Sequence, residues 1–228
     1  MLEVDRVNLV YRSGDSEHRA LRDVTLTIDQ GEFVVLRGPS GSGKSSMLYI
    51  LSALRAATSG EIRFGEHRYG VESADQLTRL RRLHFGFIFQ FHFLINYLTV
   101  LENILVAAPQ LTTTYRTRAL KLLKTLGIDQ CAKRLPHQIS GGQRQRVAVA
   151  RALVHNPQVI FADEPTASLN TEAGMDVMRL LAEHREDRTV IMVTHDDTMS
   201  RFANRAIELR DGVVVHDGLN PLYSPDHP

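Results

Sequence analysis

The chain has 228 residues, of which 43% are hydrophobic and 23% are charged, and its formal net charge at pH 7 is +1. This length suits one large domain, or one domain with an inserted subdomain, and allows a real apolar core. The balanced charge gives no support for a nucleic-acid-binding surface. Cys131 is the only cysteine, which excludes an internal disulfide and a CxxC metal or redox site and leaves a buried or idle thiol.

The first residues, MLEVDRVNLVYRSG, carry charges where a signal peptide needs an apolar run, so we expect the chain to stay in the cytoplasm. No apolar stretch approaches the ~20 residues that span a bilayer. If the protein works at a membrane, another component must be embedded there.

The first thirty or so residues alternate apolar and polar side chains, which is typical of strands. The apolar positions are Leu2, Val4, Val7 and Leu9, and then Val24, Leu26 and Ile28, with a polar RSGDSEHR segment between the two sets. We expect an antiparallel sheet element here, completed by Glu61–Phe64 after the Ser59-Gly60 turn. A short apolar strand at Phe33–Leu36 then leads through a glycine-rich turn into a helix that begins near Lys44.

The remaining chain alternates predicted helices with strands that are apolar on both faces, as expected for a parallel sheet covered by helices. The expected strands are His84–Gln90, residues 158–162 and Thr189–His195, and a final hairpin turns at Asp211-Gly212. The expected helices are Ala74–Arg82, a region through LTVLENILVA, Tyr115–Ile128, Gln143–His155 and Thr171–His184. The proline-rich tail from Asn220 is expected to be loose.

A phosphate-binding loop follows the strand at Phe33–Leu36. Residues 38–45, GPSGSGKS, form a complete G-x-x-x-x-G-K-[ST] motif. The glycines let backbone N–H groups surround an anion, and the following helix directs its positive end at the same phosphates. Lys44 adds a charge for the β- and γ-phosphates, and the Ser45 hydroxyl can hold Mg²⁺. A chance match is expected in roughly one chain in a hundred of this length, so the motif predicts nucleotide binding.

Two adjacent carboxylates end the apolar strand at residues 158–162. Asp163 and Glu164 stand at the carboxyl end of that strand, the edge where ligands bind in parallel sheets. Because neighbouring strand residues point to opposite faces, the two acids need not share a role. Asp163 can hold Mg²⁺ through water, and Glu164 can orient and deprotonate an attacking water.

A second anion site is expected at Ser140-Gly141-Gly142-Gln143, where a helix begins. Serine is a common N-cap, and the two glycines expose backbone donors. These residues lie about a hundred positions beyond the phosphate loop, so a second copy of the chain could bring them over the first copy's nucleotide.

Three further polar residues stand at strand ends. His195 follows an apolar strand directly, and Gln90 ends another, where its amide could contact Mg²⁺ or the attacking water. Tyr11 closes the second N-terminal strand and, from the pattern alone, is an amphipathic edge residue.

The motifs GPSGSGKS, ISGGQ, VIFADEP and the THD that begins at Thr194 resemble, in order and spacing, the nucleotide-binding subunits of ABC transporters. The resemblance covers nearly the whole chain, and the ISGGQ signature separates that family from other P-loop ATPases. It implies an α/β fold with a P-loop NTPase (RecA-like) core and a mostly parallel sheet. An N-terminal antiparallel β subdomain and an inserted α-helical subdomain would complete it.

The resemblance also implies roles for particular residues, with ATP and Mg²⁺ as ligands. Glu164 would be the catalytic base, His195 the switch histidine at the γ-phosphate, and Lys44 a catalytic cation. Mg²⁺ would be held by Ser45, Gln90 and Asp163. Tyr11 would stack on adenine. The other residues of the same chain that would bind the nucleotide are Gly38, Pro39, Ser40, Gly41, Ser42, Gly43, Lys44, Ser45, Ser46 and Gln90. Across a head-to-tail dimer, the nucleotide would also be bound by Ser140, Gly141, Gly142 and Gln143.

This sequence departs from the family pattern at two positions. Ile139 replaces the usual leucine of the signature, a volume-conserving change that we expect to be harmless. Asn170 stands where the family's D-loop normally ends in aspartate. It keeps hydrogen-bonding capacity but lacks the charge, so communication between the two sites of a dimer is expected to be altered.

The segment GFIFQFHFLINYLTVLENI resembles the subfamily that serves lipoprotein release, macrolide export and antimicrobial-peptide or haem export. Its permeases have few transmembrane helices and a large extracytoplasmic domain. We therefore expect a second copy of the chain and an integral membrane permease as partners, no nucleic acid, and a place on the cytoplasmic face of the cell membrane. The apolar residues that follow the strand at His84–Gln90 suggest that the permease docks near Gln90–Leu98.

A single ATPase domain would then span residues 1–228. About 1–30 and 60–70 would form the antiparallel β subdomain, about 31–58, 71–90 and 156–219 the core, about 91–155 the helical subdomain with the signature, and 220–228 the tail.

One alternative function shares all of these motifs, and three others fit less of the sequence. A module that signals through a membrane protein, as in division-linked relatives, shares all of these motifs and stays open as an alternative. ABC ATPases of translation or DNA repair carry paired ATPase domains or long coiled-coil or zinc insertions, which this chain lacks. No G-x-G-x-x-G turn follows the first strand to favour a dehydrogenase, and a kinase would need an acceptor site.

Overall fold

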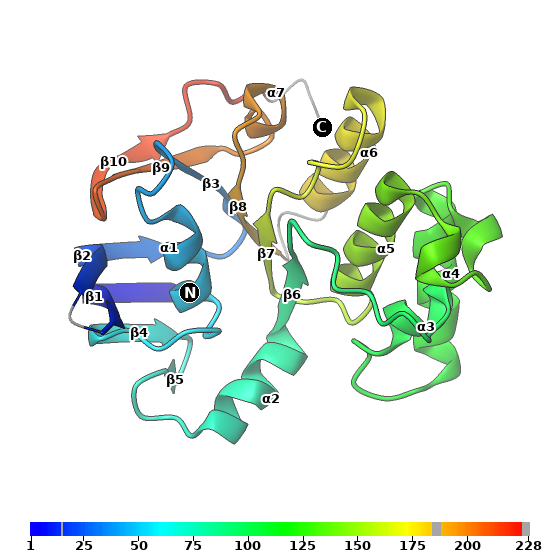
Figure 1. The fold of residues 1–228 in the computed structure, drawn as a ribbon, viewed down its shortest axis with the longest axis horizontal. Helices are drawn as coiled ribbons and strands as arrows, with labels where there is room; N and C mark the ends of the chain where they lie inside the picture. The colour runs from blue at the N-terminus through cyan, green and yellow to red at the C-terminus, as the bar shows by residue number, and fades with distance from the viewer. Residues whose placement is uncertain (15, 184–187, 225–228) are drawn as a thin grey trace.

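The computed structural model describes residues 1–14, 16–183 and 188–224. Its first sheet is antiparallel, with the order β2-β1-β4-β5 (Figure 1). The strands are β1 (Leu2–Ser13), β2 (Ser16–Ile28), β4 (Ser59–Phe64) and β5 (His67–Arg68). The predicted N-terminal antiparallel element is therefore confirmed, but the polar segment between its strands is not a loop. Arg12 pairs with Glu17 in register, because polar side chains are accommodated where a hairpin extends into solvent.

The second sheet has the order β10-β9-β3-β8-β7-β6, and only β10 is antiparallel to its neighbour. Its strands are β3 (Phe33–Arg37), β6 (Phe85–Ile88), β7 (Val159–Asp163), β8 (Thr189–Val193), β9 (Arg205–Arg210) and β10 (Val213–Leu219). This confirms the predicted α/β class with a mostly parallel sheet. Since β3, β6, β7 and β8 are parallel, their carboxyl ends meet at one edge.

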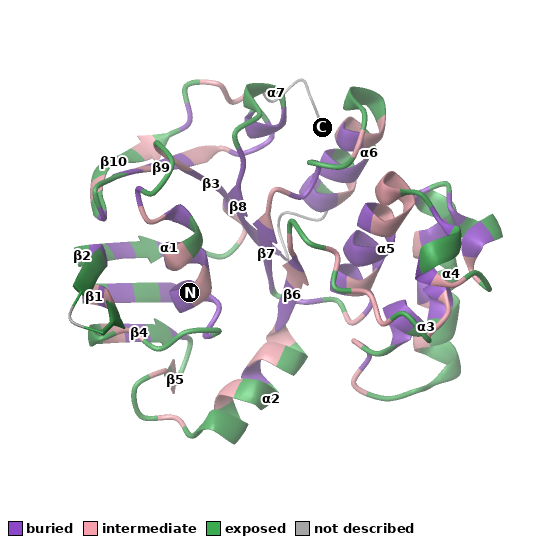
Figure 2. Cartoon of the chain, in the orientation of Figure 1, coloured by how far each residue is buried: buried purple, intermediate pink, exposed green. Residues whose placement is uncertain are grey.

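Each face of the second sheet packs against a different core. On one face, Val34, Leu36 and Phe161 join the first sheet and helix α1 (Lys44–Leu51). On the other face, Val35 and Ile160 join the helices that follow β6. The alternation comes from the two-residue period of a strand, and it explains why β3 and β7 are apolar and buried at each position before their last residues, Arg37 and Asp163 (Figure 2).

Of the other helices, those between residues 100 and 153 lie beyond β6 on the right of Figure 1. The other helices are α2 (Ala74–His84), α3 (Val100–Leu105), α4 (Thr113–Thr125), α5 (Gly141–Leu153), α6 (Thr171–Ala182) and α7 (Asp197–Ser200), with 3₁₀ turns at Asp129–Cys131 and Pro136–Gln138. Cys131 is a buried free thiol. Within the described part of the chain, no helix has the length and apolar character needed to cross a membrane. His184, the expected end of α6, lies outside the described residues.

Gly86 of β6 allows a close approach to the end of α5. A Cβ atom at this position would lie 2.5 Å from the carbonyl oxygen of Ala152 and 3.0 Å from Cγ of Pro157. Only glycine avoids that overlap, because the nearest atom belongs to the backbone and cannot rotate away. The contact holds the strand that leads to Gln90 against the helix that begins after Ser140.

The prediction of a loose tail from Asn220 is wrong for residues 220–224. Asn220 is buried, and its side-chain amide donates hydrogen bonds of 2.8 Å to the carbonyls of Ser200 and Ala203. The backbone N–H of Ser224 donates to the carbonyl of Arg201 at 3.2 Å. The asparagine satisfies carbonyls at the end of α7, a role that proline content does not reveal. Residues 225–228 of the predicted tail lie outside the described residues.

Candidate nucleotide-binding site

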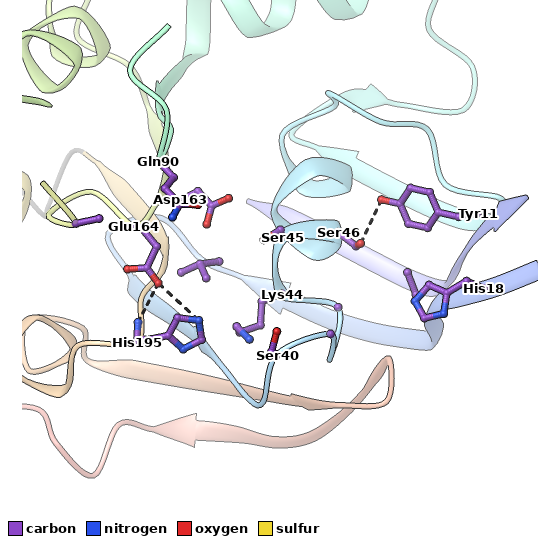
Figure 3. Close-up of a pocket in the computed structure, with 15 residues that line it drawn as sticks. Tyr11, His18, Ser40, Lys44, Ser45, Ser46, Gln90, Asp163, Glu164 and His195 are labelled. Carbon is purple, nitrogen blue, oxygen red and sulfur yellow. Dashed lines mark hydrogen bonds and ion pairs between the residues drawn. The ribbon is translucent and has the colours of Figure 1, made fainter. Parts of the chain in front are cut away.

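A cavity of about 570 Å³ lies at the edge where β3, β7 and β8 end (Figure 3). The phosphate loop and the first turn of α1 contribute Ser40, Gly41, Gly43, Lys44, Ser45 and Ser46. Other elements contribute Tyr11, Gln90, Asp163, Glu164 and His195. The structure thus brings together residues that the sequence separates by more than 180 positions.

The phosphate loop surrounds its own lysine. The ammonium of Lys44 donates hydrogen bonds of 2.8 Å to the carbonyls of Gly38 and Pro39, while Ser42 is buried in the wall of the loop. Gly43 has φ = 104°, and a Cβ there would lie 2.5 Å from the carbonyl oxygen of Ala20. Only glycine fits this turn, so the start of α1 sits directly on β2.

The charged groups of the cavity share an environment that disfavours charge. Burial lowers the pKa of Lys44, and the nearby carboxylates of Glu164 and Asp163 oppose that effect. Burial also raises the pKa of Asp163, against a hydrogen bond from Ser45 and the charge of Lys44. A phosphate group would stabilise the charged form of Lys44, and a cation bound to that phosphate would stabilise the charged forms of the carboxylates.

Glu164 is held in an unusual backbone conformation with φ = 50°. Its N–H donates to the carbonyl of Val193 at 2.9 Å. Its carboxylate accepts hydrogen bonds from the Thr194 hydroxyl at 3.1 Å and from the backbone N–H of His195 at 3.0 Å. Burial raises the pKa of Glu164, and the Thr194 bond opposes that rise. Positive φ at a non-glycine residue is costly, and such strain gathers at functional sites.

His195 and Gln90 occupy opposite sides of the carboxylates in Figure 3. The Nε2 atom of His195 lies 3.8 Å from Oε1 of Glu164, and the imidazole is largely exposed. Gln90 follows β6 and is exposed at the cavity rim. Both side chains can therefore reach a molecule bound in the cavity.

The oxygen donors of the cavity fit a magnesium ion. The side chains of Ser45 and Asp163 interact, and Gln90 lines the same space. Mg²⁺ in phosphate sites takes one or two carboxylates, keeps several waters and completes its shell from the phosphates. A hydroxyl, a carboxylate and an amide match that pattern.

Tyr11 lies at the far end of the cavity from the carboxylates (Figure 3). Its hydroxyl is 3.2 Å from the hydroxyl of Ser46. His18, which pairs with Tyr11 across the hairpin, and Ala20 of β2 also line the cavity. The sequence analysis missed His18 because it took RSGDSEHR as a polar segment between two strands, and it named no role for Ala20. The hairpin register shifts between Val4 and Val10, so extending it from Leu2 and Ile28 would not have paired His18 with Tyr11.

The signature residues Ser140, Gly141, Gly142 and Gln143 do not line this cavity. Ser140 is exposed and caps α5: its hydroxyl accepts from the N–H of Gln143 at 3.2 Å, while its N–H donates to the Gln143 side chain at 2.9 Å. The helix therefore starts at Gly141, two residues before the predicted start. A separate depression joins Ser140 and Gly142 to Ser168–Asn170.

Asn170 caps α6, accepting a 2.9 Å hydrogen bond from the N–H of Ala173. Asn170 thus caps the helix as an aspartate at this position could, but without the charge. Ile139, the other departure from the family pattern, is buried in the helical core.

The segment after Gln90 exposes three aromatic side chains. Phe91, Phe93 and Tyr97 have exposed fractions of 71%, 66% and 81%. The guanidinium of Arg151, in α5, holds the backbone of this segment by donating hydrogen bonds to the carbonyl of Phe93 at 2.8 Å and to that of His92 at 2.7 Å. We call these three side chains the aromatic patch.

Comparisons with known proteins identify the family of the chain. Residues 21–167 match the ABC transporter family. The chain is 46% identical over 221 residues, 95% of its length, to a macrolide export ATP-binding/permease protein MacB of Bradyrhizobium diazoefficiens, and spans only 34% of that relative. It is 43% identical over 94% of its length to an ABC transporter ATP-binding protein of Methanocaldococcus jannaschii, of which it covers 98%.

Two solved structures of the ABC transporter cassette MJ0796 are each 40% identical to the chain, and each comparison covers 96% of this chain and 98% of the other. One is a dimer with a TM-score of 0.91. The other is a dimeric post-hydrolysis state bound to ADP and Pi, with a TM-score of 0.89. The chain therefore belongs to the ABC transporter family, and its fold is that of the family's ATPase cassette.

Proposed function

We propose that two copies of this cassette bind two ATP molecules head to tail, hydrolyse them and drive export through a membrane permease component. The observation that carries the proposal is the cavity in which the phosphate loop, Asp163, Glu164 and His195 meet. The permease-containing MacB relatives support export as the direction of transport.

In this proposal Glu164 is the general base. Its carboxylate is aimed into the cavity by the hydrogen bonds from Thr194 and His195, and its raised pKa strengthens it as a proton acceptor. Lys44 contacts the β- and γ-phosphates in exchange for the loop carbonyls, and His195 contacts the γ-phosphate. Ser45, Asp163 and Gln90 would hold Mg²⁺, which neutralises phosphate charge when bound.

The second copy supplies the signature. Ser140 and the free N–H groups at the start of α5 face outward rather than into their own chain's cavity, so they are available to a nucleotide held by another copy. The dimeric cassette structures of MJ0796 support this arrangement. Each active site would then be completed only when two copies close.

We further propose that the aromatic patch contacts the permease at the cytoplasmic face of the membrane. Exposed aromatic side chains at this density are a common mark of an interaction surface. The patch directly follows Gln90, so a permease seated there would touch the segment that reaches the nucleotide. The cargo would be hydrophobic or amphipathic, as for haem, lipoproteins, drugs or antimicrobial peptides.

Replacing Thr194 with valine should shift the acidic limb of the kcat profile to higher pH. The hydroxyl stabilises the ionised form of Glu164, so its loss raises the pKa further and the base is protonated at a higher pH. Steady-state ATPase rates from pH 5 to 9 would measure the shift. Thr194→Ser keeps the hydroxyl and should follow the wild type; an unchanged Thr194→Val profile would remove Glu164 from the base role.

Glu164→Gln should lower kcat by at least about a hundredfold, because the amide cannot accept the proton. It should also trap ATP in a dimer that light scattering coupled to gel filtration detects. Adding Ser140→Arg should return the protein to a monomer that still binds one ATP. Normal turnover by Glu164→Gln, or loss of ATP binding by the monomeric double variant, would contradict the assignment.

Phe93→Asp should release the chain from membranes of its native host, because a charge at the centre of the aromatic patch opposes docking. The membrane-bound fraction after sedimentation is the readout, and ATP-dependent dimerisation of the purified chain should be unchanged. Val71→Asp is a matched control, since Val71 is 78% exposed and precedes α2, away from the patch. Equal membrane binding by Phe93→Asp and wild type would refute the docking surface.

A further inference from the structure

Tyr11 is held in place by two groups from the segment that contains the phosphate loop. Ser46, in the first turn of α1, lies 3.2 Å from the phenol oxygen. Arg55, four residues beyond the last residue of α1, places its guanidinium carbon 4.2 Å from the centre of the phenol ring. A cation at this distance over an aromatic face is attracted by the ring quadrupole.

Arg55 lies over one face of the Tyr11 ring. Tyr11 lines the cavity, whereas Arg55 does not. The guanidinium therefore contacts the ring without being part of the cavity wall. With one face covered, the ring keeps its other face open to a flat ligand, which can stack on it.

The path of the chain around Arg55 is itself fixed. The N–H of Arg55 donates to the carbonyl of Tyr49 at 3.1 Å, and this bond continues the end of α1. Three residues later, Thr58 joins β1: its N–H donates to the carbonyl of Asn8, and its hydroxyl accepts from the N–H of Val10. Arg55 thus stands on a short connection that is tied at one end to α1 and at the other to the strand of Tyr11.

We propose that Arg55 is a positioning residue for the nucleobase, acting through Tyr11. It holds the ring at a set distance from the phosphate loop, since Lys44, Ser46 and Arg55 all belong to α1 and its immediate continuation. The ring then presents the face that Arg55 leaves uncovered to a base attached to the bound triphosphate. This inference rests on the proposed role of Tyr11 in stacking on adenine.

The test compares ATP with inorganic tripolyphosphate, which has the phosphates but no base. Arg55→Ala should weaken ATP binding about two- to fivefold, the range of an exposed cation–π contact, and leave tripolyphosphate binding unchanged. Arg55→Lys keeps a cation over the ring and should restore most of the affinity. Dissociation constants from isothermal titration would be measured in the monomeric Glu164→Gln, Ser140→Arg background, so that neither hydrolysis nor dimerisation interferes.

Two further variants separate the positioning role of Arg55 from the stacking role of Tyr11. Tyr11→Ala should weaken ATP binding about tenfold, as for a lost base–aromatic stack, and Arg55→Ala should add nothing in that background. Arg12→Ala removes a cation beside Tyr11 that pairs instead with Glu17, so it should bind ATP like the wild type.

Each of the other possible outcomes contradicts one part of the proposal. If Tyr11→Ala weakens ATP binding but Arg55→Ala does not, Arg55 has no positioning role and the stacking role of Tyr11 stands. If Tyr11→Ala has no effect, the stacking role itself fails. If Arg55→Ala weakens tripolyphosphate as much as ATP, it acts on the fold of α1 rather than on the base.

Discussion

The parallel pairing of β3, β8 and β7 is the constraint on which the site depends. It places three strand ends side by side, and the chain leaves each end with a different chemical group. Beyond β3 the glycine-rich loop turns back into α1, beyond β7 stands Glu164, and beyond β8 stand Thr194 and His195. The bond from the N–H of Glu164 to the carbonyl of Val193 joins the last two ends. Without this register, the carboxylate would have neither its hydrogen-bond donors nor a phosphate loop opposite it.

The two cores on either side of that sheet hold different functional groups in place. The core that includes α1 and the first sheet fixes the phosphate loop and Tyr11. The core on the other face fixes α5 and, through Gly86 and Arg151, the segments on both sides of Gln90. Arg151 of the signature helix therefore contacts the backbone that carries the aromatic patch. In the proposed function, this contact would couple hydrolysis to a permease seated on the patch.

Much of the fold could be predicted because its signals are local. An apolar run of strand length followed by GPSGSGKS or by Asp163-Glu164 specifies both the element and the group at its end. What could not be predicted depends on contacts between distant segments. The roles of Gly86, Thr194 and Asn220 arise from Ala152, Glu164 and Ser200, which no spacing rule connects to them. The role of Arg55 likewise depends on a contact between distant segments, because the connection that follows α1 brings Arg55 to the strand that carries Tyr11.

The central claim is that each cavity is half of an active site, and that Ser140–Gln143 of another copy complete it. The most direct measurement is photo-labelling with an ATP analogue that carries an azide on the γ-phosphate. Tagged chains with Lys44→Ala, which should not hold the probe themselves, would be mixed with untagged Glu164→Gln chains that do. We expect label in the tagged chain, within the peptide that contains residues 140–143. Label confined to the untagged chain would contradict the account.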